Sequence, residues 1–330
     1  MGRPDVSLTD TFGRVHRDLR ISLTDRCSLR CTYCMPAEGV PWLERDGILT
    51  AAEIERVARV CVDLGVTSIR LTGGEPLVRS DVVDIVARLA ALGPALSMTT
   101  NGLRLADLAE PLRAAGLDRV NVSIDTLDRE RFARLTRRDR LDDVLAGIDA
   151  ARSAGFRPLK LNAVALRDVN EDELVDLVAF AIGLGAQLRF IEQMPLDAGH
   201  TWDRSAMLTG AEILARLAEK YRLDPVPGRG SAPAQTWTLD GGPDTVGVIA
   251  SVTAPFCGAC DRLRLTADGQ VRNCLFARQE SDLVPVLRGG GTDADIAAIF
   301  TASVSAKRAG HGIDSPEFIQ PDRPMSAIGG

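Results

Sequence analysis

The chain has 330 residues, of which 45% are hydrophobic and 25% are charged, and this composition excludes a disordered or fibrous protein. Its 39 Lys and Arg residues are outnumbered by 45 Asp and Glu residues, and the net charge of −6 disfavours non-specific nucleic-acid binding. No apolar run approaches the roughly 20 residues that span a bilayer, and the N-terminal residues lack an apolar signal core. We therefore expect a cytoplasmic protein with neither nucleic acid nor membrane as a partner.

Short apolar strands alternate with amphipathic helices over residues 17–192. Strands are predicted at 19–23, 68–71, 96–98, 120–124, 159–165 and 188–191. Helices are predicted at 51–64, 81–92, 141–154 and 171–184. Strands that alternate with helices pair in parallel through right-handed crossovers. Six such units predict an α/β fold, either an open doubly wound sheet or an incomplete barrel.

The pattern changes near residue 195, and we divide the chain there into residues 1–195 and 196–330. Thr209 is expected to cap a helix that ends near residue 220. Further strands are predicted at 235–239, 245–251, 262–266 and 270–272, and further helices at 282–287 and 293–307. Asp268-Gly269 predicts a tight hairpin turn between the last two strands. The second part is therefore predicted to be α+β.

Cys27, Cys31 and Cys34 follow the first strand, with three and then two residues between them. A structural zinc site needs four ligands, and no fourth Cys or His lies nearby. Three thiolates with one open corner suit an iron–sulfur cluster that keeps one iron free for a ligand. This spacing, with Tyr33 before the third cysteine, resembles the signature of the radical S-adenosylmethionine (SAM) superfamily. By contrast, Cys61 stands alone in an apolar helical pattern and is predicted to be buried.

Polar residues mark the ends of the other strands. Gly73-Gly74-Glu75-Pro76 follows the second strand, where adjacent glycines allow a ligand to approach and Glu75 offers a carboxylate to the ammonium group of methionine. Other polar or functional side chains lie on or after the later strands: Thr99, Ser123, Lys160, Arg189 and Met194. Each alone is equally explained by a structural hydrogen bond. As a set at one rim of a parallel barrel they indicate a binding site.

A second cysteine group lies near the end of the chain. Cys257 and Cys260 are separated by two residues, and Cys274 follows after thirteen more. A zinc ribbon is the structural alternative, and it needs a fourth ligand from the distant His200 or His311. Arg262 and Arg264 share one face of the adjacent strand. Two guanidinium groups beside a three-thiolate cluster indicate a site for an anionic substrate.

The whole pattern resembles the GTP 3′,8-cyclase family of molybdenum-cofactor biosynthesis. The resemblance runs from about residue 13 to residue 330 and rests on both cysteine spacings and the arginines after the second group. It also rests on residues 18–27, 121–125 and 189–194, and on the final Gly329-Gly330. The family implies an incomplete (βα)6 TIM-type barrel whose opening is closed by a C-terminal α+β domain.

The resemblance also implies the site. It assigns one 4Fe–4S cluster to Cys27, Cys31 and Cys34 for SAM, and a second to Cys257, Cys260 and Cys274 for the guanine of GTP. Implied SAM contacts are Tyr33, Gly74, Glu75, Ser123 and Met194. Implied GTP contacts are Arg20, Arg70, Thr99, Lys160, Arg189, Arg262 and Arg264, with Arg20, Arg262 and Arg264 also assisting catalysis. Relatives can carry lysine where this chain has Ser68, so we expect weaker triphosphate binding or another arginine in that role.

The implied reaction is that of a radical SAM lyase at the first step of the pathway. A 5′-deoxyadenosyl radical takes the 3′ hydrogen of GTP, and C3′ then bonds to C8 to give (8S)-3′,8-cyclo-7,8-dihydroguanosine 5′-triphosphate. An external one-electron reductant is implied, as is transfer of the product to cyclic pyranopterin monophosphate synthase. The protein is expected to be a monomer or homodimer. Two alternatives are a radical SAM peptide-modifying enzyme and a non-enzymatic iron–sulfur or zinc scaffold.

Overall fold

The computed structural model describes residues 7–329, and within them twelve strands form one sheet. The strands are β1 (Asp18–Ser22), β2 (Ser68–Thr72), β3 (Ala95–Thr100), β4 (Arg119–Ser123), β5 (Lys160–Ala165), β6 (Gln187–Glu192), β7 (Leu223–Pro225), β8 (Gln235–Leu239), β9 (Thr245–Ile249), β10 (Arg262–Leu265), β11 (Gln270–Arg272) and β12 (Ser281–Asp282). Their order is β12-β11-β10-β1-β2-β3-β4-β5-β6-β9-β8-β7. Strands β1 to β6 are parallel neighbours in chain order, which confirms the predicted six-unit barrel.

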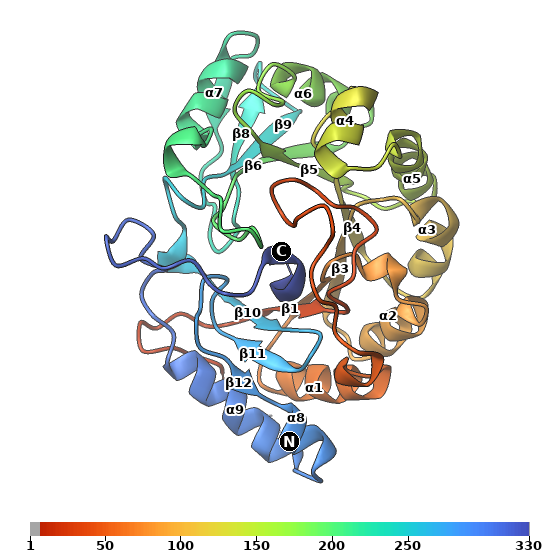
Figure 1. Cartoon of the computed structure of the whole chain (residues 1–330), viewed down its shortest axis with the longest axis vertical. Coiled ribbons are helices and arrows are strands. Elements are labelled where there is room, and N and C mark those ends of the chain that lie inside the picture. Colours follow the sequence, from red (N-terminus) through yellow and green to blue (C-terminus); the bar gives the residue numbers. More distant parts are fainter. Residues whose placement is uncertain (1–6, 330) are drawn as a thin grey trace.

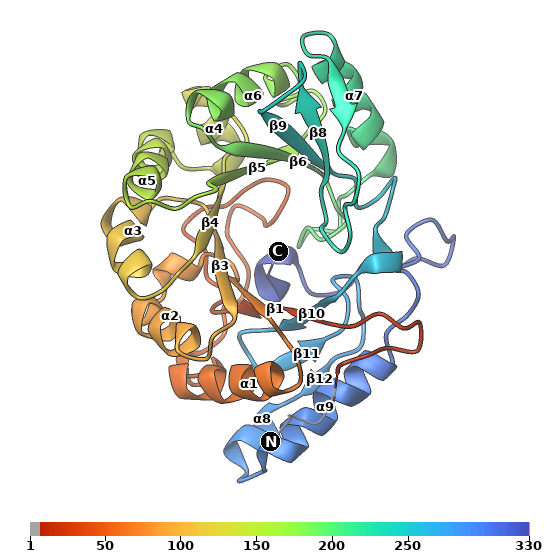
Figure 2. The ribbon, with the colours of Figure 1, turned by 180° about the vertical axis from the view of Figure 1, so that it is seen from behind.

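The helices lie mainly outside the curved sheet, as Figure 1 shows. They are α1 (Ala51–Asp63), α2 (Val82–Ala90), α3 (Leu105–Ala114), α4 (Arg129–Thr136), α5 (Leu141–Ser153), α6 (Leu174–Gly183), α7 (Gly210–Ala218), α8 (Val284–Arg288), α9 (Asp293–Ser305) and α10 (Met325–Ile328). The short 3-10 helices are η1 (Arg45–Gly47), η2 (Pro76–Val78), η3 (Arg204–Ala206) and η4 (Cys257–Ala259). Only α10 lies inside the ring of strands, where both views place the C-terminus (Figures 1 and 2).

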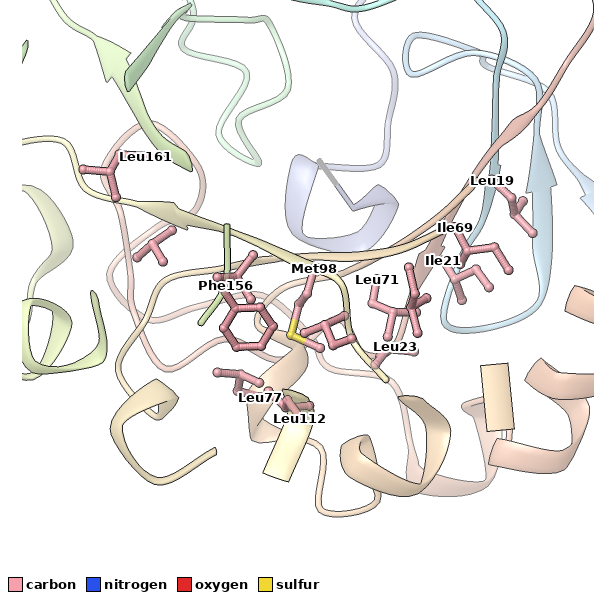
Figure 3. Packing of buried hydrophobic residues seen from close by; sticks show 14 of the residues in the cluster. Leu19, Ile21, Leu23, Ile69, Leu71, Leu77, Met98, Leu112, Phe156 and Leu161 are labelled. Carbon is pink, nitrogen blue, oxygen red and sulfur yellow. The ribbon is translucent and has the colours of Figure 1, made fainter. Parts of the chain in front are cut away.

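Alternation along the strands separates an apolar outer face from a polar inner face. Leu19 and Ile21 of β1 are fully buried and pack with Ile69 and Leu71 of β2 on the helix side, as Figure 3 shows. Successive side chains of a strand point to opposite faces, so Arg20 between these leucine and isoleucine residues faces the interior of the barrel. The apolar residues that build the core therefore also determine which polar residues line the site.

Segments from the C-terminal part extend the sheet at both edges. Strand β10 pairs in parallel with β1, and β9 pairs in parallel with β6. Strands β11 and β12 continue antiparallel beyond β10, and β8 and β7 continue antiparallel beyond β9. The C-terminal part thus narrows the barrel opening from both sides. The division at residue 195 cuts one continuous sheet and remains a prediction.

Most predicted elements agree with the structure to within three residues at each end, and the hairpin at Asp268-Gly269 connects β10 and β11 as predicted. Cys61 is fully buried in α1, as predicted. Helices α3 and α4 were not predicted, since α3 contains Pro111 and α4 has only eight residues. The tail helix α10 was not predicted either. Within residues 7–329, no helix combines the length and apolar character needed to cross a membrane.

Candidate active site

The barrel encloses a cavity of about 320 Å³, which is lined by both cysteine groups. Predicted site residues that line it are Arg20, Cys27, Cys31, Tyr33, Cys34, Arg70, Gly74, Glu75, Thr99, Ser123, Arg189, Met194, Cys257, Cys260, Arg262, Arg264 and Cys274. Lys160 is the exception. It occupies the first position of β5, outside the cavity lining but close enough to Arg189 and Arg70 for its charge to be repelled by theirs.

The first cysteine group occupies the loop after β1. A turn with Cys34 N–H donating to the Cys31 carbonyl (2.9 Å) shapes this loop, and the Asn101 side chain donates to Ser28 Oγ at 3.1 Å. Burial raises the pKa of Cys27 to about 11 and that of Cys34 to about 12. A bound cation is the ordinary means of holding such thiols as thiolates. The donor set therefore fits an iron–sulfur cluster.

His311, one of the two candidate fourth ligands for the second cysteine group, has both ring nitrogens engaged elsewhere. His311 lines the same cavity, but its Nε2 lies 3.1 Å from the Ser251 carbonyl and its Nδ1 accepts from Ile313 N–H at 3.1 Å. Among residues 7–329, no three His, Cys, Asp or Glu side chains converge closely enough to hold one metal ion. A cubane cluster does not require such convergence, because each thiolate binds a different iron.

The Gly-Gly-Glu-Pro turn after β2 docks directly on the first cysteine loop. Gly74 N–H donates to the Thr24 carbonyl at 2.8 Å, and a Cβ at Gly74 would lie 2.3 Å from the Asp25 carbonyl oxygen. The Glu75 carboxylate accepts hydrogen bonds from Leu77 N–H, Thr100 Oγ1 and Asn101 N–H. Burial raises the pKa of Glu75 to about 7. Glu75 thus braces the turn, and its contact with the methionine ammonium remains a prediction.

Asp125 positions the aromatic residue of the first cysteine loop. Tyr33 donates its phenol proton to Asp125 Oδ2 at 2.7 Å, while Asp125 Oδ1 accepts from Val164 N–H at 2.8 Å. Burial raises the pKa of Asp125 to about 6. In the sequence, Asp125 belongs to the run of alternating polar residues 121, 123 and 125, although its contact with Tyr33 was not predicted. The period-2 pattern that marked Ser123 was the available signal.

Cations line the inner face of the barrel. Strand register places Arg20 directly between Arg264 on β10 and Arg70 on β2. Burial lowers the pKa values of all three, and mutual repulsion among the cations adds to that effect. Five polar atoms on this face are buried without a hydrogen-bond partner in the described part of the chain: Asp18 Oδ1, Arg20 Nε, Arg70 Nε, Asn121 Nδ2 and Asn162 Oδ1. Asp18 attracts Arg20 and Arg70, but one carboxylate does not balance these cations, so the face still favours the anionic groups that a phosphorylated ligand supplies.

The second cysteine group has a more electropositive environment. Burial opposes ionisation of Cys260, but Arg262 and Lys307 bring its pKa below the usual value. Lys307 is buried, donates to the Arg262 carbonyl at 2.8 Å and lies 3.6 Å from Cys260 Sγ. Arg262 lies 4.6 Å from the Phe256 ring centroid and donates to the Ser231 carbonyl. The sequence alone did not identify Lys307, because its contact with Cys260 joins residues 47 positions apart.

The C-terminal tail enters the cavity. The Ser326 backbone amide donates to the Cys34 thiol, and Ser22 Oγ donates to the Ile328 carbonyl at 2.7 Å. Arg264 donates to the Gly329 carbonyl. A Cβ at Gly329 would lie 2.3 Å from Ser22 Oγ. Gly329 therefore lies beside Arg264, while Gly330 lies outside the described residues.

Comparisons with known proteins agree with this geometry. The radical SAM superfamily profile matches residues 21–181, and a profile described as molybdenum cofactor synthesis C matches residues 186–313. The chain is 58% identical to a GTP 3′,8-cyclase of Mycobacterium sp. (strain KMS), over 98% of this chain and 93% of that protein. It is 56% identical to a GTP 3′,8-cyclase of Streptomyces coelicolor, over 98% and 96% of the two chains.

Solved structures with the same fold are more distant in sequence. SuiB of Streptococcus suis superposes with a TM-score of 0.62 at 16% identity, over 95% of this chain and 77% of that one. The structure titled anSMEcpe with bound AdoMet superposes with a TM-score of 0.59 at 15% identity, over 92% and 82% of the chains. These similarities establish the fold of the chain.

Proposed function

The chain belongs to the GTP 3′,8-cyclase family of the radical SAM superfamily, and we propose that it converts GTP to (8S)-3′,8-cyclo-7,8-dihydroguanosine 5′-triphosphate. The observation that carries the proposal is that one cavity contains both three-cysteine groups and the cationic inner face of the barrel. A peptide substrate gives no reason for so many buried cations, whose charges Asp18 and Asp261 offset only in part, whereas a triphosphate does.

The first cysteine group would hold one 4Fe–4S cluster, and the surrounding loops would hold SAM. When bound, this pair supplies the 5′-deoxyadenosyl radical that removes the 3′ hydrogen of GTP. Tyr33 is held by Asp125, and Gly74 is held against the cysteine loop, so both present fixed contacts to SAM. Ser123, Met194 and Glu75 line the same end of the cavity. Fixed contacts reduce the motion that would misplace a reactive carbon.

The second cysteine group would hold another 4Fe–4S cluster, next to the guanine of GTP. Arg20, Arg262 and Arg264 would bind the triphosphate and stabilise charge as C3′ bonds to C8. Arg70 and Arg189 extend this cationic surface, and Thr99 adds a hydroxyl. Lys160, at the first position of β5 and outside the cavity lining, would add a further positive charge near Arg70 and Arg189. The tail residues Met325 and Ser326 line the cavity and would help to keep water and other reactants from the radical.

The remaining proposals concern the organisation of the protein. Residues 1–195 would carry the SAM cluster and residues 196–330 the second cluster and the GTP site. We propose cytoplasmic function as a monomer or homodimer, with an external one-electron reductant. The product would pass to cyclic pyranopterin monophosphate synthase.

The test is anaerobic reconstitution followed by incubation with SAM, a reductant and each nucleoside triphosphate in turn. GTP deuterated at C3′ should transfer deuterium into 5′-deoxyadenosine and yield the cyclised product. The other triphosphates serve as matched controls and should give little of either. Deuterium transfer from no nucleotide, or equal product formation from ATP, would refute the proposal.

A further inference from the structure

The second cysteine group faces a second cleft on the outside of the barrel. Cys257, Cys260 and Cys274 line the central cavity and also this outer cleft. The first group, Cys27, Cys31 and Cys34, lines the central cavity only. A cluster held by the second group would therefore form part of the wall between the substrate cavity and the exterior. This inference rests on the proposed second cluster.

Residues 273–279 and 306–319 supply most of the lining of the outer cleft. The N-terminal segment, which contributes Arg14, lies beside the segment that follows α9 (Figures 1 and 2). Arg14 ties them together, since its guanidinium donates to the carbonyls of Cys257, Arg308 and Ala309 at 2.7, 2.7 and 3.0 Å. Its Nε is paired with the buried Asp10 at 2.6 Å. The wall around the cysteines is thus fixed by buried hydrogen bonds, so the cleft has a defined shape.

The lining of the outer cleft is cationic in a chain of net charge −6. It contains four cationic side chains, Arg14, Arg278, Lys307 and Arg308, and one carboxylate, Glu317. Arg278 and Arg308 are exposed, whereas Lys307 is buried beside Cys260 on the floor. The apolar Ile319 is 56% exposed at the same cleft. A basic surface with an exposed apolar residue is suited to an acidic protein partner.

We propose that the outer cleft is the docking site of an acidic one-electron carrier protein of the flavodoxin or ferredoxin class, which reduces the second cluster from outside. Each encounter transfers one electron: the carrier is oxidised, the cluster is reduced, and no bond forms or breaks. Electron-transfer partners use small interfaces and rely on electrostatic steering for rapid association. The cleft offers both features at the point where the cysteines approach the exterior.

The test uses the holoenzyme with both clusters, mixed rapidly with flavodoxin hydroquinone as the donor. Freeze-quench electron paramagnetic resonance follows each cluster, and added SAM identifies the signal of the cluster that binds it. The variant is the double charge reversal Arg278→Glu/Arg308→Glu. The matched control is Arg134→Glu/Arg152→Glu, which makes the same change of net charge at exposed positions on α4 and α5. Reduced methyl viologen, a small cation, is the second donor.

We expect the cleft variant to slow reduction of the second cluster by flavodoxin at least tenfold at low salt. The difference should shrink as salt screens the charges. The control variant should be reduced at the wild-type rate, and methyl viologen should reduce the cleft variant at least as fast as wild type. Equal flavodoxin rates in both variants, with about eight irons per chain, would overturn the docking site. A chain that binds four irons and shows one signal would instead overturn the proposed second cluster.

Discussion

Replacing Gly329 with alanine tests whether the tail must enter the barrel. Gly329 has a φ of +82°, and an added Cβ would lie 2.3 Å from Ser22 Oγ and 2.7 Å from Thr72 Cγ2. The positive φ costs about 1–2 kcal/mol for a residue with a side chain. The collision of the added Cβ with these two side chains costs about 1–3 kcal/mol more, as overpacking generally does.

Together these terms destabilise the inserted tail by about 2–5 kcal/mol, which is a shift of about 30-fold or more in its equilibrium. We expect Gly329→Ala to keep both clusters and to bind GTP within about threefold of wild type. Turnover should fall tenfold or more, since Arg264 loses the carbonyl that holds it. Deleting Gly329 and Gly330 should have the same effect.

The assay compares iron content, GTP affinity by equilibrium dialysis, and product formation. Gly228→Ala is the matched control, because Gly228 has a φ of +78° but no atom within 4 Å of its added Cβ. It carries the same backbone strain without the collision in the barrel, so its turnover should be that of wild type. Wild-type turnover in Gly329→Ala with full clusters would refute the reasoning.

Three further predictions concern the clusters and the cationic face. Anaerobic protein should contain about eight irons and eight sulfides per chain, and stoichiometric zinc with little iron would contradict this count. Alanine at Cys27, Cys31 or Cys34 should abolish SAM cleavage. Alanine at Cys257, Cys260 or Cys274 should remove cyclisation but leave uncoupled SAM cleavage. Equal rates of SAM cleavage in both sets of variants would refute the assignment of the two cysteine groups. Burial lowers the pKa of Lys160 to about 8, so its charge is lost as pH rises. GTP affinity should therefore fall about tenfold from pH 7 to pH 9 in wild type, and a similar fall in Lys160→Met would show that another group titrates.

The sequence predicts best what depends on local spacing. The three residues between Cys27 and Cys31 place both thiols in one loop, and alternation at Leu19, Arg20 and Ile21 shows which side chain faces inward. These patterns need no knowledge of distant segments. The six strand–helix units and both cysteine groups could therefore be predicted from the residues, whereas the choice of a barrel over an open sheet rested on the family resemblance.

Local sequence patterns do not predict contacts between segments that are far apart in the chain. Lys307 reaches Cys260 only because the end of α9 packs against β11 and next to β10. The four-residue α10 is too short to form alone, and its hydrogen bonds to residues of the barrel are what hold it. Glu75 was selected from its sequence motif, but the motif does not reveal the three donors that bind its carboxylate.

The tail links the two ends of the cavity. Its first turn places the Ser326 amide on Cys34, a residue of the first cysteine group, while Gly329 contacts Arg264, which follows the second group. Arg264 is fully buried beside Arg20 and Arg262, whose charges repel it. A neutral carbonyl offsets this repulsion only in part, because it supplies a dipole rather than a charge. The cationic face therefore keeps an unmet preference for an anion even with the tail inserted, and that preference is what a triphosphate would satisfy.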